Sequence, residues 1–327
     1  MGLKLYPESD IENIASAVRT KFNTNSSFTV TEMSQFLSSA SIGGGDYVSK
    51  YLDQVSVLSV PSVSRVPTYR FYGNSVLTEV TFDNCFYIYS SAFISCSSLV
   101  SANFPICITV YNGAFAFCTS LENISLPNCT SIVSNNFYMP FASCSALRTI
   151  SLPKISQIAS SLFTYLSLSS VYLSICDKIY NSAFQSNYYL NLISAPSCSS
   201  VYQYAFRSCN SIASIDLPAL NYIGSYAFAY CTQLNTFKMG SGRTTGATSS
   251  FISQYAFRGC WNLLSFYVLT PYVTGLSNVN VFASTPISTY TTSTGGVRGT
   301  IYVPASLLAT YKTATNWLNY SDIMVGI

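Results

Sequence analysis

The sequence predicts a β-rich solenoid, in which coils of about 22 residues stack into a parallel sheet between a small helical unit and a closing helix. Three observations predict it. A phenylalanine recurs about every 22 residues, a cysteine follows most copies three residues later, and a motif of the form L-x-x-I-x-L-P comes next. A repeat of this length cannot bury its own apolar face, so each coil must be covered by its neighbours.

The first expected element is a helical attachment or capping unit over residues 1–42, followed by a glycine hinge at 43–46. Ser9 and Glu12 have the spacing of a capping box, as do Thr29 and Glu32. Apolar residues then recur at helical spacing, which predicts two helices. The candidate attachment residues are Ile11, Ile14, Val18, Met33 and Phe36. The alternative is that this unit only shields the first coil from water.

The solenoid is expected over residues 47–304, as ten or eleven coils. In each strand motif the Ile and the second Leu point inward and the residue between them points outward. With strands about 4.8 Å apart, the rod is on the order of 50 Å long. The anchor residues are Phe71, Phe93, Phe115, Phe137, Phe163, Phe184, Phe206, Phe228 and Phe257, with a weaker copy at Phe282.

The eleven cysteines occupy two repeated places in the coil, which indicates a structural role. Cys is small and often buried, and the same place in other coils holds Asn74, Leu166 or Asn187. A catalytic thiol normally needs a base such as His, and the chain has no His. No pair of cysteines has the close spacing of a zinc knuckle. We therefore expect free, buried thiols, no bound metal and no cofactor.

Residues 305–327 are expected to cap the last coil. The stretch from Pro304 to Met324 has the pattern of one amphipathic helix, and Trp317 is expected to pack against the last coil rather than lie exposed.

The composition excludes several classes of function. Charged residues make up 8% of the chain and the net charge is +3, with no basic cluster of the kind that grips nucleic acid. No apolar run is long enough to span a membrane, so membrane insertion is not expected. The start has no apolar segment of the signal-peptide kind, which predicts that the chain is not exported by the ordinary route. The 26 tyrosines and the many Ser, Thr and Asn residues are typical of adaptable binding surfaces.

Over residues 47–304 the pattern AFxxCxSLxxIxLPxxxxxI resembles the BspA-type leucine-rich repeat. The resemblance implies a leucine-rich-repeat solenoid used for adhesion or ligand capture, without family-wide catalytic residues. The sequence departs from the pattern at Tyr138–Phe141, at Gly240–Ser250, and in one shortened repeat near Leu168.

The first 42 residues resemble a segment that precedes variable domains in tail and other structural proteins of bacteriophages and prophages. The resemblance implies attachment to other virion proteins through the N-terminal helices. A homotrimer is predicted by analogy with fibre proteins only. The matching residues are Ile11, Ile14, Ala15, Ala17, Val18, Arg19, Lys21, Glu32 and Met33.

Outward residues four places after the motif Leu form a nearly uncharged column that suits sugar hydroxyls or a protein loop. The alternative is a sheet face that is merely soluble. The insertion at 240–250 is a further candidate, because insertions in solenoids collect on one face. The candidate ligand-binding residues are Asn103, Ser125, Tyr172, Asp216, Lys238, Arg243 and Tyr267.

Two tyrosine columns lie near the anchor phenylalanines, and they either stiffen the solenoid or offer ring faces to a ligand. One begins Tyr89 and Tyr111 and continues at Tyr180 and Tyr202; the other holds Tyr204, Tyr226 and Tyr255.

The sequence thus predicts a non-enzymatic recognition protein with no catalytic residues. A glycosidase needs two carboxyl groups about 5 to 9.5 Å apart, and Glu79, Glu122 and Asp216 lie in different coils. The favoured hypothesis is a bacteriophage or prophage virion component, a tail fibre, baseplate or head decoration, that assembles in the host cytoplasm and binds a bacterial surface glycan or protein. The alternatives are a cell-surface adhesin and an intracellular scaffold.

Overall fold

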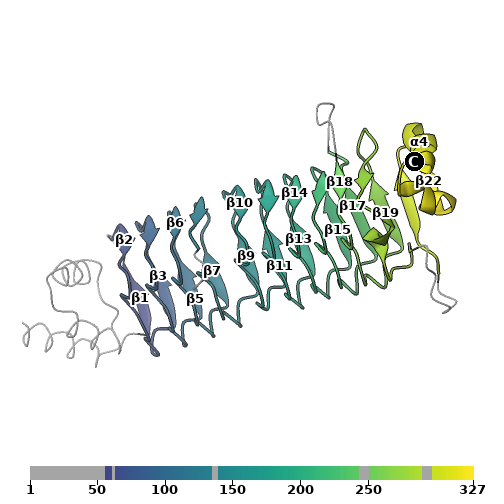
Figure 1. Ribbon diagram of the computed structural model, residues 1–327. Helices are drawn as coiled ribbons and strands as arrows, with labels where there is room; N and C mark the ends of the chain where they lie inside the picture. The colour runs from purple at the N-terminus through teal and green to yellow at the C-terminus, as the bar shows by residue number, and fades with distance from the viewer. Residues whose placement is uncertain (1–55, 61–62, 135–138, 243–249, 289–296) are drawn as a thin grey trace, which may run out of the picture.

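The computed structural model describes residues 56–60, 63–134, 139–242, 250–288 and 297–327. They form one elongated solenoid of stacked coils, with the C-terminal cap at one end of the rod (Figure 1). This confirms the predicted parallel solenoid of ten or eleven coils, and the structure has about eleven. The predicted helices and hinge of residues 1–46, with the attachment residues Ile11, Ile14, Val18, Met33 and Phe36, lie outside the described residues.

One side of each coil is a strand of three or four residues, and these strands pair in parallel along the rod. Hydrogen-bonded pairing runs through β1-β3-β5-β7, then β9-β11-β13, then β15-β17-β19-β21-β22. In most strands the second residue is buried and its neighbours face outward. The strands are β1 (Val57–Ser59), β3 (Glu79–Thr81), β5 (Ser101–Asn103), β7 (Asn123–Ser125), β9 (Thr149–Ser151), β11 (Ser170–Tyr172), β13 (Leu192–Ser194), β15 (Ser214–Leu217), β17 (Thr236–Met239), β19 (Ser265–Val268) and β21 (Thr300–Val303).

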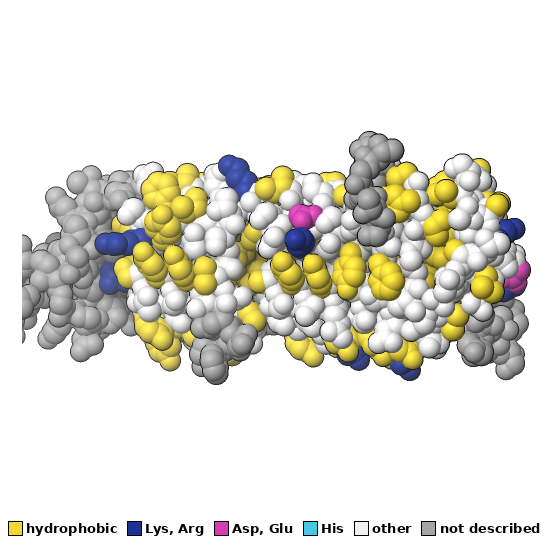
Figure 2. Space-filling model, turned by 45° about the horizontal axis from the view of Figure 1, so that its top comes forward, with side chains coloured by type: hydrophobic (Ala, Val, Ile, Leu, Met, Phe, Trp, Pro, Cys, Tyr) yellow, Lys and Arg dark blue, Asp and Glu magenta, His cyan; other side chains and the backbone are white. Residues whose placement is uncertain are grey.

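The second side of each coil is a strand of two residues, which forms a second parallel sheet in two runs, β2-β4-β6-β8 and β10-β12-β14-β16-β18-β20. Figure 2 shows rows of hydrophobic side chains along the rod. The short strands are β2 (Arg65–Val66), β4 (Tyr87–Ile88), β6 (Thr109–Val110), β8 (Ser131–Ile132), β10 (Gln157–Ile158), β12 (Lys178–Ile179), β14 (Ser200–Val201), β16 (Tyr222–Ile223), β18 (Phe251–Ile252) and β20 (Gly275–Leu276).

The third side of each coil is a series of tight turns around the anchor phenylalanine, which we call the turn side. Alternate residues there donate their N–H to the next coil: Phe206 to the carbonyl of Ala227 and Ser208 to that of Ala229, both at 2.8 Å. This pattern puts the residues two before and two after the anchor in the left-handed region, with φ of 59° at Tyr204 and 61° at Ser208. Such values are uncommon for residues other than glycine.

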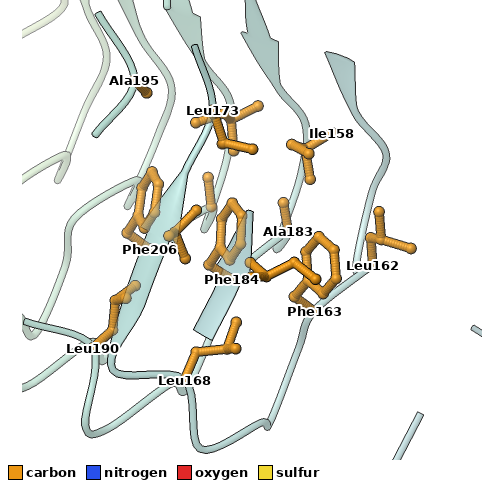
Figure 3. Close-up of a cluster of buried hydrophobic side chains, with 14 of the residues drawn as sticks. Ile158, Leu162, Phe163, Leu168, Leu173, Ala183, Phe184, Leu190, Ala195 and Phe206 are labelled. Atoms are coloured by element: carbon orange, nitrogen blue, oxygen red, sulfur yellow. The ribbon is translucent and has the colours of Figure 1, made fainter. Parts of the chain in front are cut away.

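The core is a column of stacked phenylalanine rings, one from each coil (Figure 3). Phe163, Phe184 and Phe206 have ring centroids 5.3 and 5.2 Å apart and are fully buried. Leucines of the strand motif, such as Leu168 and Leu190, pack below them. Burying one such ring contributes roughly 1.5 to 3 kcal/mol before ordering entropy is subtracted.

The predicted anchor at Phe137 is wrong, because Phe141 occupies that place in the column. Its ring stacks between Phe115 at 5.8 Å and Phe163 at 5.6 Å. The four additional residues of this coil therefore lie before the anchor, and Phe141 is not part of an insertion. Phe137 itself lies outside the described residues.

The cap contains several short elements instead of the single helix predicted from Pro304 to Met324. It consists of the 3-10 turns η2 (Ala305–Leu307) and η3 (Trp317–Ile323), the helix α4 (Leu308–Thr313), and the strand β22 (Met324–Gly326), which pairs with β21. The helix ends early, and the chain reverses through Asn316 at φ 67°. Trp317 is fully buried, and its ring nitrogen donates to the Thr274 carbonyl. A further 3-10 turn, η1 (Val279–Phe282), precedes β21.

Candidate binding surface

The outer face of β15, β17, β19 and β21, which we call the strand face, brings together several predicted ligand-binding residues. Asp216, Lys238 and Tyr267 stand in register on neighbouring strands, and Tyr302 continues the row. The Tyr267 and Tyr302 rings are parallel within 10°, with centroids 4.3 Å apart. The Lys238 ammonium lies 5.2 Å from the centroid of the Tyr267 ring.

A row of hydroxyl groups lies beside these residues on the strand face. It has one member on each strand, two residues before the row of larger side chains, which places the two rows roughly 7 Å apart. Its members are Ser214, Thr236, Ser265 and Thr300. The strand face therefore offers two stacked tyrosine side chains, one cation, one carboxylate and a line of hydroxyls within four coils.

The structure separates the other predicted ligand residues from this group. Asn103 and Ser125 are register partners on β5 and β7, and Tyr172 lies on β11 between Ser151 and Ser194. Arg243 lies outside the described residues. Tyr302 was not among the predicted ligand residues, although RGTIYVP fits the repeat frame and places Tyr302 in the same column as Tyr267.

The predicted tyrosine columns are also stacked. On the side of the short strands, Tyr89 and Tyr111 have centroids 5.2 Å apart, and Tyr180 and Tyr202 are 4.9 Å apart. On the turn side, Tyr226 stacks on Tyr255 at 5.1 Å.

The eleven cysteines are buried and free, as predicted. Those that follow the anchor by three residues donate their thiol to the anchor carbonyl of the preceding coil, as Cys118 does to Phe93 at 3.0 Å. Burial raises the pKa of Cys85 and of Cys176 to about 11. A thiol with a pKa this high stays protonated at neutral pH and is a poor nucleophile.

No group of three or more metal-ligating side chains gathers among the residues that the structure describes. In the same part of the chain, no helix is long and apolar enough to cross a membrane.

Parallel coils built around columns of Phe, Leu and Cys define this chain as a leucine-rich-repeat solenoid. The chain belongs to the BspA type leucine rich repeat family: the pattern of the "BspA type Leucine rich repeat region (6 copies)" matches residues 41–140, 64–191, 138–235 and 177–295. The predicted resemblance of residues 47–304 is thereby confirmed. The resemblance of residues 1–42 to virion proteins stays a prediction.

Comparison with solved structures finds several similar chains. A leucine-rich repeat protein from Bacteroides ovatus is 19% identical with a TM-score of 0.54, over 76% of this chain and 63% of that one. The chain thus spans less than two thirds of the length of that protein. The pneumococcal vaccine antigen PcpA is 13% identical (TM-score 0.41; 83% of this chain, 79% of that one). A leucine rich cell surface protein from Faecalibacterium prausnitzii is 16% identical (TM-score 0.33; 71% and 86%). A comparison with curated proteins finds no match.

Proposed function

We propose that the protein is a non-enzymatic recognition protein that binds a cell-surface glycan through the strand face. The observation that carries this proposal is the register of the stacked Tyr267 and Tyr302 rings with the Lys238 ammonium and the neighbouring row of hydroxyls. Tyrosine side chains combine apolar contact area with a phenolic hydroxyl, and hydroxyls exchange hydrogen bonds with those of a sugar. Membership of the BspA-type family supports a role in adhesion or ligand capture.

The carboxylates support a role without catalysis. Glu79 lies in β3 and Glu122 directly precedes β7, with β5 between these two strands. Two strand spacings put their backbones about 10 Å apart, which is marginal for an inverting glycosidase, and both side chains are exposed. Asp216 lies in β15, several coils further along the rod.

The test is a glycan-array screen of the full chain, followed by titration calorimetry with the best-bound glycan. We expect Tyr302→Ser to weaken binding at least tenfold, because it removes one ring of the stacked pair. The matched control is Tyr89→Ser, which removes one ring of the stacked pair on the side of the short strands. Equal losses in both variants, or capture of a protein loop and no glycan, would show that the strand face is not a glycan site.

We infer further that the solenoid acts at an exterior surface, as an adhesin of the bacterial cell that makes it. The virion component is the second candidate, and the specific observation in its favour is the N-terminal pattern that includes Ile11, Arg19 and Met33. In that case the first 42 residues contact other virion proteins and the solenoid meets the host envelope.

Immunogold electron microscopy with antibody against residues 47–327 separates the two locations. Gold on the surface of uninduced cells supports the adhesin, whereas gold on particles released after prophage induction supports the virion component. Light scattering of the full chain tests the trimer predicted by analogy with fibre proteins, and a monomer contradicts it.

A further inference from the structure

A ladder of tyrosine rings runs along the turn side of three successive coils. Tyr204, Tyr226 and Tyr255 each lie two residues before an anchor phenylalanine and have φ between 57° and 59°. The centroids of neighbouring rings are 5.3 and 5.1 Å apart. The same coils contribute β15, β17 and β19, so this ladder and the strand face are different sides of one segment of the rod.

Two arginines lie on the end rings of this ladder. The guanidinium carbon of Arg207 is 5.5 Å from the centroid of Tyr204 and 5.6 Å from that of Tyr230, so the group lies between two rings. The guanidinium carbon of Arg258 is 5.3 Å from the centroid of Tyr255. In the coil between them the equivalent residue is Ala229, so that coil carries no third arginine at this position.

Neither arginine has a carboxylate partner among the described residues, where the ion pair present is Arg298 with Asp322. The Nε atom of Arg207 is buried and has no hydrogen-bond partner within the described chain. A buried donor without a partner costs stability, and an anion bound to the same guanidinium offsets part of that cost through its charge. The ring contacts hold the guanidinium in place but leave its hydrogen-bonding capacity for an anion.

The spacing fits a ligand that carries negative charge along an extended backbone. Arg207 and Arg258 are two coils apart, about 10 Å between their backbones at the strand spacing of a parallel sheet. Guanidinium groups bind carboxylate or phosphate through paired hydrogen bonds, and tyrosine side chains add apolar contact area and a hydroxyl.

We propose that Arg207, Arg258 and the ladder of Tyr204, Tyr226 and Tyr255 form a second binding site, for an acidic saccharide. The arginines bind its carboxylate or phosphate groups and the tyrosines pack against its sugar rings. This site uses none of the side chains assigned to the strand face, so either site can fail in experiment without the other.

The test measures binding of the full chain to polygalacturonate and to a glycerol-phosphate polymer, with neutral dextran and polyglutamate as comparison polymers. We expect one or both acidic saccharides to bind, and the Arg207→Gln/Arg258→Gln variant to bind at least tenfold more weakly. The polymer that binds identifies the anion as carboxylate or phosphate. The control is Arg65→Gln/Lys312→Gln, which removes two exposed positive charges elsewhere and should change binding less than threefold.

Three results would overturn the proposal: no binding of either acidic saccharide, equal loss in the two double variants, or polyglutamate binding as tightly as the saccharides. The second result would mean non-specific attraction to positive charge, and the third a site for acidic peptides. Circular dichroism and the thermal unfolding midpoint verify that each variant is folded. The single variant Tyr226→Ser keeps both arginines and tests the rings separately, with an expected loss of at least threefold.

Discussion

Replacing Asn187 by alanine should destabilise the solenoid far more than replacing a cysteine of the same column. Asn187 occupies the place three residues after its anchor, where most coils have Cys. Its side-chain nitrogen donates to the carbonyls of Phe163 at 2.7 Å and Phe184 at 2.9 Å, and its oxygen accepts from the N–H of Leu168 at 3.3 Å. The side chain is fully buried, so water cannot replace these bonds in the folded state.

The magnitude follows from the number of hydrogen bonds lost. Each contributes about 0.5 to 1.5 kcal/mol, and a buried group left without a partner costs about 1 to 3 kcal/mol. Asn187→Ala should therefore lower the free energy of unfolding by about 3 kcal/mol. Cys209→Ala is the matched control, because it removes one thiol bond to the Phe184 carbonyl at 3.2 Å. As a thiol is a weak donor, we expect about 1 kcal/mol there.

The assay is equilibrium urea denaturation followed by far-ultraviolet circular dichroism, and the comparison is made only between variants with the same m-value. Hydrogen exchange of the coils around residues 163–190 verifies that the loss is local, as expected when each coil contacts only its neighbours. The reasoning is refuted if Asn187→Ala costs no more than Cys209→Ala.

Three further predictions use the same unfolding measurements. Gly259→Ala should lower the free energy of unfolding by at least about 1 kcal/mol more than Gly73→Ala does. Both glycines have positive φ, but an added Cβ at Gly259 meets the Tyr230 ring at 2.7 Å, whereas nothing lies within 4 Å of one at Gly73. Burial raises the pKa of Cys129 to about 11, above about 8.5 for an unfolded thiol, so its contribution to stability is complete below pH 8.5 and declines as pH rises toward 11. The prediction is contradicted if the Cys129→Ala variant loses as much stability between about pH 8.5 and about 11 as the unsubstituted protein does. Tyr311→Phe removes two hydrogen bonds of its hydroxyl to loop backbone and should weaken the cap by about 1 to 2 kcal/mol, read from tryptophan fluorescence; an unchanged midpoint contradicts it.

The sequence was sufficient to predict the solenoid because every coil has the same interior space to fill. Similar residues, such as the anchor Phe and the Leu of the strand motif, therefore recur at the same places in the repeat. The same frame predicted that Asp216, Lys238 and Tyr267 stand in a row, since residues alternate sides along a strand. It failed at Phe137, where a second phenylalanine lies four residues later. The offset of three residues between Phe141 and Cys144, shared with the other coils, could have identified the correct anchor.

The arginine contacts on the turn side could not be predicted in the same way. They depend on the left-handed backbone at Tyr204 and Tyr230, which have φ of 59° and 62°. Left-handed φ is normally associated with Gly, Asn or Asp, so the tyrosines gave no indication of it. The hydrogen bonds between coils impose this conformation, and those bonds appear only once the coils are stacked.

The repeated cysteine and its substitute Asn187 show why inward residues of the rod serve the fold and outward residues are available for binding. Most anchor carbonyls already accept the N–H of their own coil three residues on, and in six coils the thiol of the next coil adds a second bond, as Cys96 and Cys118 do at Phe93. This position therefore favours a small side chain that can donate but is apolar enough to be buried, and Cys meets both conditions, whereas Leu166 meets only the second. Because such requirements constrain the inward residues of most coils, the residues that differ most freely between coils are the outward ones. Both proposed sites consist of these outward residues, so substitutions there should change binding while the stacked core persists.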